Sequence, residues 1–402
     1  MTAPLRVLHA IASLSPLRGG PTMGMRITLE ALRRRGVQVD VVTTDDDGPG
    51  RRRVPLDGFT ALDGQRVRYF PRQSRRYSAS WPLLHWLVRH VRAYDLVHTH
   101  ALFSFVPVVA AWQARAARVP YLMAPHGVLD SWGMQNKSAH IKRASIGLLE
   151  GRLLQQAAAV HFMSDLERRR ALQLGLTLRP LVLPLGFDFS TEAPAQGVAD
   201  ELCADGRQVI LYLSRIHEIK RVDHLLRAYA ALPQRASCLL AIAGTGEPAL
   251  LATLQRLAQQ LGIAAQVRWL GFAAGARKSG LLSCASVFVL PSASENFGVA
   301  LIEAMHAALP VICTHGAGLA EFVERAGAGV VIDDTVASLQ AALTQLLADA
   351  PLRARMGAGG RRAVAQELSI DAYGSRLESF YRSVLDSSGA RAAAICPRGV
   401  AS

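Results

Sequence analysis

The chain has 402 residues, of which 50% are hydrophobic, and it carries a formal net charge of +14. It is long for one domain, and its apolar content is sufficient to build two hydrophobic cores. Its longest apolar stretch, around residues 101–112, is too short to cross a bilayer, which requires roughly 20 residues.

The positive charge is concentrated in the first half of the chain. Residues 1–190 hold 26 Lys and Arg against 13 Asp and Glu, whereas residues 191–402 hold 19 against 18. No nucleic-acid fold signature accompanies this charge, so an anionic membrane surface is the better partner and no nucleic acid is expected. The cysteines show neither paired nor metal-binding spacing, which fits the reducing cytoplasm; they are Cys203, Cys238, Cys284, Cys313 and Cys396.

The chain opens with a predicted strand, a glycine turn and a helix. Residues 6–12 have the pattern of a strand, and apolar residues recur at helical spacing from Met25 onwards. Gly19 and Gly20 lie between them. Because glycine lets the backbone approach an anion closely, such a turn can bind phosphate, although glycine and proline also form ordinary turns.

Three consecutive aspartates, Asp45 to Asp47, follow a predicted strand at residues 39–44. A run of carboxylates can bind a divalent metal ion. Here the run lies in a loop with Gly and Pro, so the sequence predicts a solvated turn.

Basic and aromatic residues alternate between Arg66 and Arg92. Apolar residues recur at helical spacing from Trp81 to Val91, with Arg89 off that stripe. Such a helix can lie in the headgroup layer of an anionic membrane, or its stripe can pack on the sheet of its own domain. The membrane interpretation predicts lipid contacts for Arg72, Arg75 and Arg76.

Histidines lie at the ends of two predicted strands. In the strand at residues 95–100, His98 and His100 point to the same face, and His126 follows the strand at residues 120–125, with Trp132 a little further on. These histidines could begin a zinc site, but zinc needs a further ligand, so we prefer His100 as a residue of the site wall. His126 is either a binding residue or a structural histidine of a turn.

A second α/β unit is predicted after a linker at residues 188–207. Residues 209–213 have the composition of a buried parallel strand, and a helix follows from Val222. Arg215 and Lys220 lie between them, at the carboxyl end of the strand, where open α/β sheets bind ligands. Arginine and lysine can both bind phosphate oxygens, so the loop predicts a phosphate site; a solvated surface loop is the alternative.

Gly244, Thr245 and Gly246 match part of the dinucleotide-binding fingerprint. The next predicted strand, residues 267–271, does not end in the acidic residue that would bind a ribose. The motif also follows the second strand of its unit and not the first. A nicotinamide-dependent oxidoreductase is therefore disfavoured.

The run from residue 295 to residue 303 is the most informative in the chain. Glu295 precedes a predicted helix and Glu303 lies within it, and the residues between them expose N–H groups at the start of that helix. Carboxylates accept hydrogen bonds from hydroxyls, while N–H groups bind phosphate or sugar oxygens. The run therefore predicts a nucleotide-sugar site; a polar loop before a helix that contains Glu is the alternative.

Two glutamates separated by seven residues, with an arginine and a lysine upstream, resemble the retaining nucleotide-sugar glycosyltransferases of family 4 (group 1). The resemblance covers about residues 5–385 and includes bacterial enzymes that build exopolysaccharide, capsule or lipopolysaccharide O-antigen. The family more often has glycine before the arginine and after the lysine, where this chain has Ser214 and Arg221.

The resemblance implies an α/β fold of the GT-B architecture, with two Rossmann-like parallel-sheet domains facing across a cleft. It implies an acceptor-binding domain at residues 1–187 and a nucleotide-sugar-binding domain at residues 208–369. A helix at residues 370–386 would cross back to the first domain, and we expect residues 387–402 to form a disordered tail.

The resemblance also implies roles for individual residues. Arg215 and Lys220 would hold the donor diphosphate, which removes the need for a metal or other cofactor, and Gly19 and Gly20 would face the same phosphates. His126 would lie beside the reacting sugar, with His100 and Trp132 on the acceptor side. The ribose would bind Glu303, and the donor sugar would bind Glu295 and the backbone of Asn296, Phe297, Gly298 and Val299.

The implied reaction moves a sugar from a UDP- or GDP-linked donor to a saccharide acceptor, such as one carried on polyprenyl diphosphate. The expected location is the inner face of the cytoplasmic membrane. A nucleotide-sugar epimerase, which would turn over donor without acceptor, remains an alternative. So do a non-enzymatic nucleotide-sugar-binding protein, which would release no nucleotide, and a nucleic-acid binder, which would need only the basic half.

Overall fold

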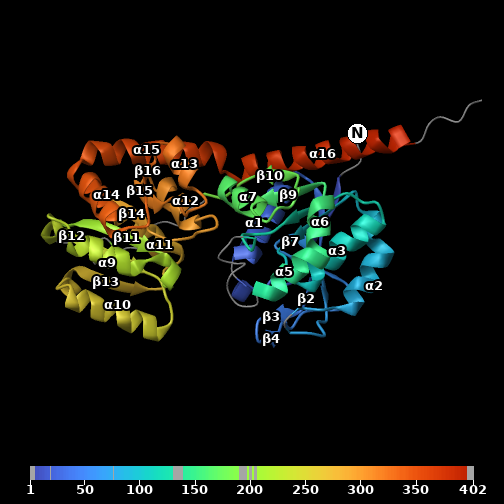
Figure 1. The fold of residues 1–402 in the computed structure, drawn as a ribbon, viewed down its shortest axis with the longest axis horizontal. Coiled ribbons are helices and arrows are strands. Elements are labelled where there is room, and N and C mark those ends of the chain that lie inside the picture. The colour runs from blue at the N-terminus through green and yellow to red at the C-terminus, as the bar shows by residue number, and fades with distance from the viewer. Residues whose placement is uncertain are drawn as a thin grey trace, which may run out of the picture. The chain divides into compact units, whose positions relative to one another are not determined.

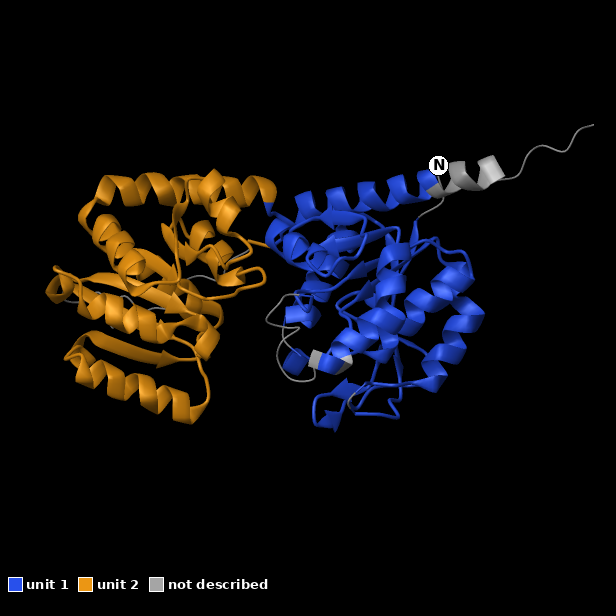
Figure 2. Ribbon diagram, viewed as in Figure 1, with its two compact units in different colours: residues 1–187, 368–402 blue, residues 188–367 orange. Residues whose placement is uncertain are grey.

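The computed structural model describes residues 5–18, 20–75, 77–129, 139–189, 197–198, 202 and 206–395. Gly19, Arg76, Trp132, most of the predicted linker and residues 396–402 lie outside this set. The chain divides into two compact units, Met1–Phe187 with Leu368–Ser402, and Asp188–Glu367 (Figure 2). Each unit contains a sheet dominated by parallel strands, which confirms the predicted α/β architecture.

The first unit is built on an eight-stranded sheet with the order β10-β9-β8-β7-β1-β2-β6-β5 (Figure 1). Only β5 pairs antiparallel with its neighbour. The central strands β1, β7 and β8 are almost entirely buried, as aliphatic parallel strands covered on both faces should be. Their carboxyl ends meet at one edge of the sheet. The strands are β1 (Arg6–Ile11), β2 (Gln38–Thr44), β5 (Phe59–Leu62), β6 (Gln65–Phe70), β7 (Leu96–His100), β8 (Tyr121–Ala124), β9 (Ala159–Phe162) and β10 (Pro180–Val182).

The helices of the first unit follow the strands in the alternation that the sequence predicts. For example, Ser80 caps α2 by accepting a hydrogen bond from the backbone N–H of Leu83, and Pro82 lies in the first turn of that helix. The helices are α1 (Gly20–Arg34), α2 (Trp81–His90), α3 (Phe105–Ala116), α5 (Ala139–Ser145), α6 (Gly151–Gln156) and α7 (Asp165–Leu172).

The second unit is built on a six-stranded, fully parallel sheet with the order β13-β12-β11-β14-β15-β16. The order reverses direction between β11 and β14, and a reversal of this kind is where open α/β sheets bind ligands. The strands are β11 (Gln208–Leu213), β12 (Cys238–Ala243), β13 (Val267–Gly271), β14 (Val287–Leu290), β15 (Val311–Thr314) and β16 (Gly329–Ile332). The helices are α9 (Val222–Ala230), α10 (Pro248–Gln260), α11 (Gly275–Cys284), α12 (Val299–His306), α13 (Ala320–Arg325), α14 (Val336–Ala348) and α15 (Ala350–Glu367).

The C-terminal helix α16 (Ile370–Ile395) packs on α1 of the first unit, as predicted (Figure 1). Tyr373 of α16 lies 2.9 Å, hydroxyl to hydroxyl, from Thr28 of α1, and Arg35 pairs with Glu378 at 2.9 Å. The predicted end at residue 386 is wrong, because the helix continues to Ile395. The segment past residue 386 contains several alanines and no proline before Pro397, so it has a high helix propensity.

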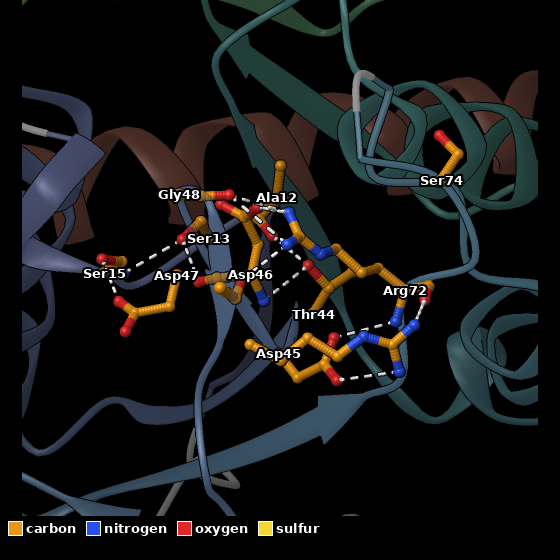
Figure 3. A network of polar contacts seen from close by, with 12 residues as sticks. Ala12, Ser13, Ser15, Thr44, Asp45, Asp46, Asp47, Gly48, Arg72 and Ser74 are labelled. Atoms are coloured by element: carbon orange, nitrogen blue, oxygen red, sulfur yellow. Dashed lines mark hydrogen bonds and ion pairs between the residues drawn. The ribbon is translucent and has the colours of Figure 1, made fainter.

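The run Asp45 to Asp47 is not the solvated turn that the sequence predicts. Asp45 and Asp46 are buried, and β3 (Asp46–Asp47) pairs with β4 (Gly50–Arg51). Asp46 bonds Arg72, and the backbone N–H of Arg72 donates to Asp45 at 2.9 Å (Figure 3). Asp46 also pairs with Arg18 at 2.7 Å. Burial alone would raise the pKa of Asp46, but the two guanidinium groups hold it below its usual value. Arg72, which is 26 residues from Asp46 in sequence, therefore pairs with the Asp46 carboxylate and is not free to contact lipid.

The apolar stripe predicted for residues 81–91 is divided between core and solvent. Leu87 and Val91 are buried, together with Trp86, which is off the predicted stripe. Trp81 and Val88 remain 63% and 56% exposed. The buried residues of α2 are Leu83, Trp86 and Leu87, so the buried side of the helix is rotated from the predicted stripe and only part of that stripe packs in the core. Among the described residues, none of the helices is long and apolar enough to cross a membrane.

Candidate active site

In the second unit, the loop after β11 is fixed against the loop after β12. The backbone N–H of Ile216 donates to Thr245 at 2.8 Å. A Cβ atom at Gly244 would overlap the carbonyl oxygen of Ser214, and one at Gly246 would overlap that of Ile216. These glycines are therefore required for the close approach of two loops, which gives the Gly-Thr-Gly run a structural reason other than dinucleotide binding.

The loop that follows β11 places the two predicted cations, Arg215 and Lys220, in different environments. The hydroxyl of Tyr212 donates to the backbone carbonyl of Arg215 at 3.0 Å, and the Arg215 side chain is exposed. Lys220 is buried at the end of a short 3₁₀ turn, and its Nζ bonds Oε2 of Glu295. Arg221 adopts φ +53°, which explains why a glycine would suit this position.

Glu295 lies on a loop that hydrogen bonds to a neighbouring turn. Its backbone N–H donates to Gly316 at 3.0 Å, and its carbonyl accepts from Gly318 at 2.8 Å. The backbone N–H of Ala293 donates to Ile219 at 2.8 Å, which joins the same loop to the segment that carries Lys220. Backbone hydrogen bonds therefore hold Lys220 and Glu295 together, although they are 75 residues apart in sequence.

The helix after Glu295 begins where the sequence predicts. Gly298 adopts φ +90° at the start of α12, a conformation that residues other than glycine rarely adopt. Phe297, the residue before it, is buried. Asn296 and Val299 are partly exposed on either side. Glu303, on the second turn of α12, pairs with Lys278 of α11 at 2.7 Å. Sequence analysis missed Lys278, because nothing in its local pattern connects it with α12.

In the first unit, α1 begins at Gly20, which is exposed and has open space where a side chain would lie. His126 follows β8 with φ +56°, and Gly127 after it donates its backbone N–H to Glu167 of α7 at 2.5 Å. Glu167 also accepts from the backbone N–H of Met163 at 2.8 Å, so this buried carboxylate holds the turn that carries His126. Sequence analysis missed Glu167 as well, because it lies in a run rich in charge.

His126 is the partly exposed end of a histidine cluster. His100 lies 3.1 Å from it, between the Nδ1 atom of His100 and Nε2 of His126, and is itself only 1% exposed. The prediction that His100 belongs to the site wall is therefore wrong, since β7 is buried on both faces. His9, His98 and His161 complete the cluster, with ring centroids 4.4 to 5.5 Å from a neighbouring histidine.

Burial keeps these rings uncharged at neutral pH. It lowers the pKa of His9 and of His126 to about 3 and that of His161 to about 4, and it holds those of His98 and His100 well below 6.5. His9, His98 and His100 each place a ring nitrogen within 4.8 Å of the other two, a spacing that could hold a metal ion. The nitrogens of His9 and His100 that face each other are 2.9 Å apart and share a hydrogen bond, which a bound metal would have to replace.

Two family models match the chain, one to each half. The model described as Glycosyl transferase 4-like domain matches residues 19–186, and that of Glycosyl transferases group 1 matches residues 199–363.

Several named relatives are similar over most of the chain. D-inositol 3-phosphate glycosyltransferase of Kineococcus radiotolerans is 30% identical, with 90% of each chain covered. GDP-mannose:cellobiosyl-diphosphopolyprenol alpha-mannosyltransferase of Komagataeibacter xylinus is 28% identical over 82% of this chain and 80% of its own.

Solved structures show the same fold. Sucrose-phosphate synthase of Thermosynechococcus elongatus superposes with a TM-score of 0.74 at 22% identity, covering 95% of this chain and 100% of that one. Anabaena HepE in complex with UDP and glucose gives a TM-score of 0.73 at 20% identity, covering 94% of this chain and 100% of its own.

Proposed function

Because the chain belongs to the family 4, group 1 glycosyltransferases of the GT-B fold, we propose that it is a retaining enzyme whose nucleotide-sugar donor binds the second unit. The observation that carries this proposal is the ion pair of the buried Lys220 with the partly buried Glu295, on loops that also carry the exposed Arg215 and lead into α12. Burying a charged group costs free energy. Buried charges in proteins are therefore found mainly where they are paired with an opposite charge or bind a ligand.

Each group in this arrangement has a chemical task. Arg215 and Lys220 stabilise the negative charge that develops on the departing diphosphate. Glu303 accepts hydrogen bonds from the ribose hydroxyls, and Glu295 does so from the donor sugar, together with N–H groups at the start of α12. Substitution takes place on the front face of the sugar, and the leaving phosphate removes the proton of the attacking hydroxyl, so no protein nucleophile is needed.

The donor is proposed to be a UDP- or GDP-linked sugar. HepE is described in complex with UDP, and the Komagataeibacter relative is named for GDP-mannose and a diphosphopolyprenol acceptor. The proposed acceptor is accordingly a saccharide on a lipid diphosphate, as in the assembly of bacterial surface polysaccharide. A thermal-shift panel of nucleotide sugars tests the donor, because a ligand at 100 times its Kd stabilises a protein by about 2.7 kcal/mol. No shift with any UDP- or GDP-sugar would contradict the proposal.

Transfer is expected to proceed without a divalent metal. Two cations at the diphosphate supply the charge that a metal ion provides in other transferases. With the donor identified by the panel, nucleotide release should be unchanged in excess EDTA. Complete loss of release, restored by Mn²⁺ or Mg²⁺, would instead assign the diphosphate charge to a metal.

The first unit is proposed to contact an anionic membrane through the exposed side of α2. Trp81, Val88 and Arg89 are exposed and recur at helical spacing. Apolar side chains can enter the headgroup layer while arginine meets anionic lipid, an attraction worth about 1 kcal/mol for each cation and weakened by salt.

Vesicle sedimentation tests the membrane contact. Binding should require anionic lipid, fall as salt rises, and weaken when Trp81 and Val88 both become Ser. Phe272→Ser is the matched control, because Phe272 is an equally exposed aromatic residue, 73% accessible, in the second unit. Equal sedimentation with neutral and anionic vesicles would contradict the contact.

A further inference from the structure

Four histidines and a tyrosine of the first unit form a continuous hydrogen-bonded chain. It runs from Nε2 of His126 to Nδ1 of His100 at 3.1 Å, and from Nε2 of His100 to Nδ1 of His9 at 2.9 Å. From Nε2 of His9 it reaches the hydroxyl of Tyr381 at 3.5 Å, and that hydroxyl lies 2.7 Å from Nδ1 of His98. Tyr381 is a fully buried residue of α16, so the chain connects the C-terminal helix to the turn that carries His126.

The protons in such a chain must all point in one direction. A neutral imidazole has one N–H donor and one acceptor nitrogen, and a tyrosine hydroxyl donates once. If each link holds one proton, choosing the donor in any link fixes the donor in every other. Two arrangements are therefore allowed, one with protons directed from His126 towards His98 and one with them directed from His98 towards His126.

The buried end of the chain selects between the two arrangements. Nε2 of His98 is buried and has no hydrogen-bond partner among the described residues. If His98 accepted from Tyr381, this nitrogen would carry an unpaired N–H, which is rarer in protein interiors than an unpaired acceptor. His161 shows the preferred solution: its Nε2 must donate to the carbonyl of Leu183 at 2.8 Å, which leaves its unpartnered Nδ1 as an acceptor.

We infer that His98 donates to Tyr381 and that the chain thereby fixes His126 in the tautomer that carries its proton on Nδ1. Tyr381 donates to His9, His9 to His100, and His100 to Nε2 of His126, so Nε2 is occupied. The only ring group of His126 that remains for a ligand is the Nδ1–H donor. The functional meaning of this donor rests on the proposed function.

A fixed N–H donor restricts what His126 can do in transfer. It can donate a hydrogen bond to a sugar oxygen and so orient the donor, but it cannot accept the proton of the attacking hydroxyl. Burial supports this limit, because it lowers the pKa of His126 to about 3. Tyr381, His9, His98 and His100 are then positioning residues, which act on the sugar only through the His126 ring.

Nitrogen NMR of the protein labelled with ¹⁵N-histidine tests the inference. At pH 7.5 the His126 signals, assigned by their loss in His126→Gln, should show a proton on Nδ1 and none on Nε2. Tyr381→Phe removes only the hydroxyl and so breaks two links of the chain, the one to His9 and the one to His98. His126 should then populate both tautomers, and kcat should fall by about twofold when the two are equally populated, because half the molecules are then competent.

Tyr373→Phe is the matched control. Tyr373 is also a fully buried tyrosine of α16, but its hydroxyl contacts Thr28 and is not part of the chain. This variant should lose comparable stability and keep the wild-type His126 spectrum. A proton on Nε2 of wild-type His126, or the same His126 spectrum in Tyr381→Phe as in wild type, would overturn the inference.

Two further results separate the inference from neighbouring ideas. Stoichiometric zinc in the purified protein would overturn it, because a metal between His9 and His100 would replace their shared proton. If the spectrum is as expected but the protein binds no nucleotide sugar, the proposed function fails and the tautomer assignment stands.

Discussion

Lys220→Met is expected to lower turnover on the order of 10²-fold, a loss of about 2.7 kcal/mol of transition-state stabilisation. The effect should be large because Lys220 is buried and its ammonium group is already oriented by Glu295. A preorganised charge needs no rearrangement when the diphosphate leaves. Methionine keeps the apolar length of the side chain, so the substitution removes the charge and little packing. Arg215→Ala should have an effect of similar order.

Lys278→Met is the control for a general loss of positive charge. Lys278 pairs with Glu303 as Lys220 pairs with Glu295, in the same unit, but the Lys278 side chain is more exposed, at 29% against 10%. Because Glu303 is assigned to the ribose, this variant should change nucleotide binding more than turnover. The double variant Lys220→Met with Glu295→Gln should be less impaired than the two single effects added together, since the groups are in contact. Wild-type turnover in both Lys220→Met and Arg215→Ala would remove the diphosphate assignment.

Local pattern was sufficient to predict the strands that position the loops of the candidate site in the second unit. The aliphatic run before Arg215 and the one before Glu295 have the composition of buried strands, and parallel strands place their following loops at one edge. The ion pair between Lys220 and Glu295 was not predicted as a contact, because it depends on the hydrogen bonds of the intervening loops. Lys278 could have been found only from the packing of α11 against α12.

Long-range pairing explains what could not be predicted in the first unit. The alternation of strand and helix was visible, but a histidine on β1 and another on β7 are adjacent only because the two strands pair in register. Tyr381 is 372 residues from His9. Arg72 illustrates the same limit. The basic and aromatic residues around it indicated an exposed surface, whereas its partner Asp46 lies in β3, 26 residues earlier in the chain. For α2, apolar residues occur around most of the helix, so spacing alone could not identify the buried side.

The first unit is expected to lose stability steeply as pH falls below about 6.5. His9, His98, His100 and His161 are fully buried, and burial holds each pKa below the value of about 6.5 that it has when unfolded. Between the folded and unfolded pKa values the unfolded chain binds more protons, so the free energy of unfolding decreases on acidification. Each histidine contributes at most about 1.4 kcal/mol per pH unit, and the four together at most about 5.5 kcal/mol per pH unit.

The pH dependence from the buried histidines should account for most of the stability lost on acidification, before protonation of carboxylates contributes. Hydrogen bonds from Arg33 lower the pKa of Glu30 to about 2, so its contribution is lost only below about pH 4.5. A domain stable by about 5–15 kcal/mol would therefore unfold within one to three pH units of 6.5. Fluorescence of the Trp269→Phe variant reports the first unit, because the remaining tryptophans all belong to it.

Replacing one buried histidine tests the cause of the slope. His98→Asn keeps a hydrogen-bonding group near Tyr381 and removes one titrating ring, so the pH dependence of urea unfolding should become shallower by about 1.4 kcal/mol per pH unit. His85→Asn, on the exposed side of α2, should leave the slope unchanged. If the first unit kept its full free energy of unfolding at pH 4.5, this prediction would be contradicted. Protonating a histidine in a closed core costs free energy, so buried neutral rings should destabilise the folded state at that pH.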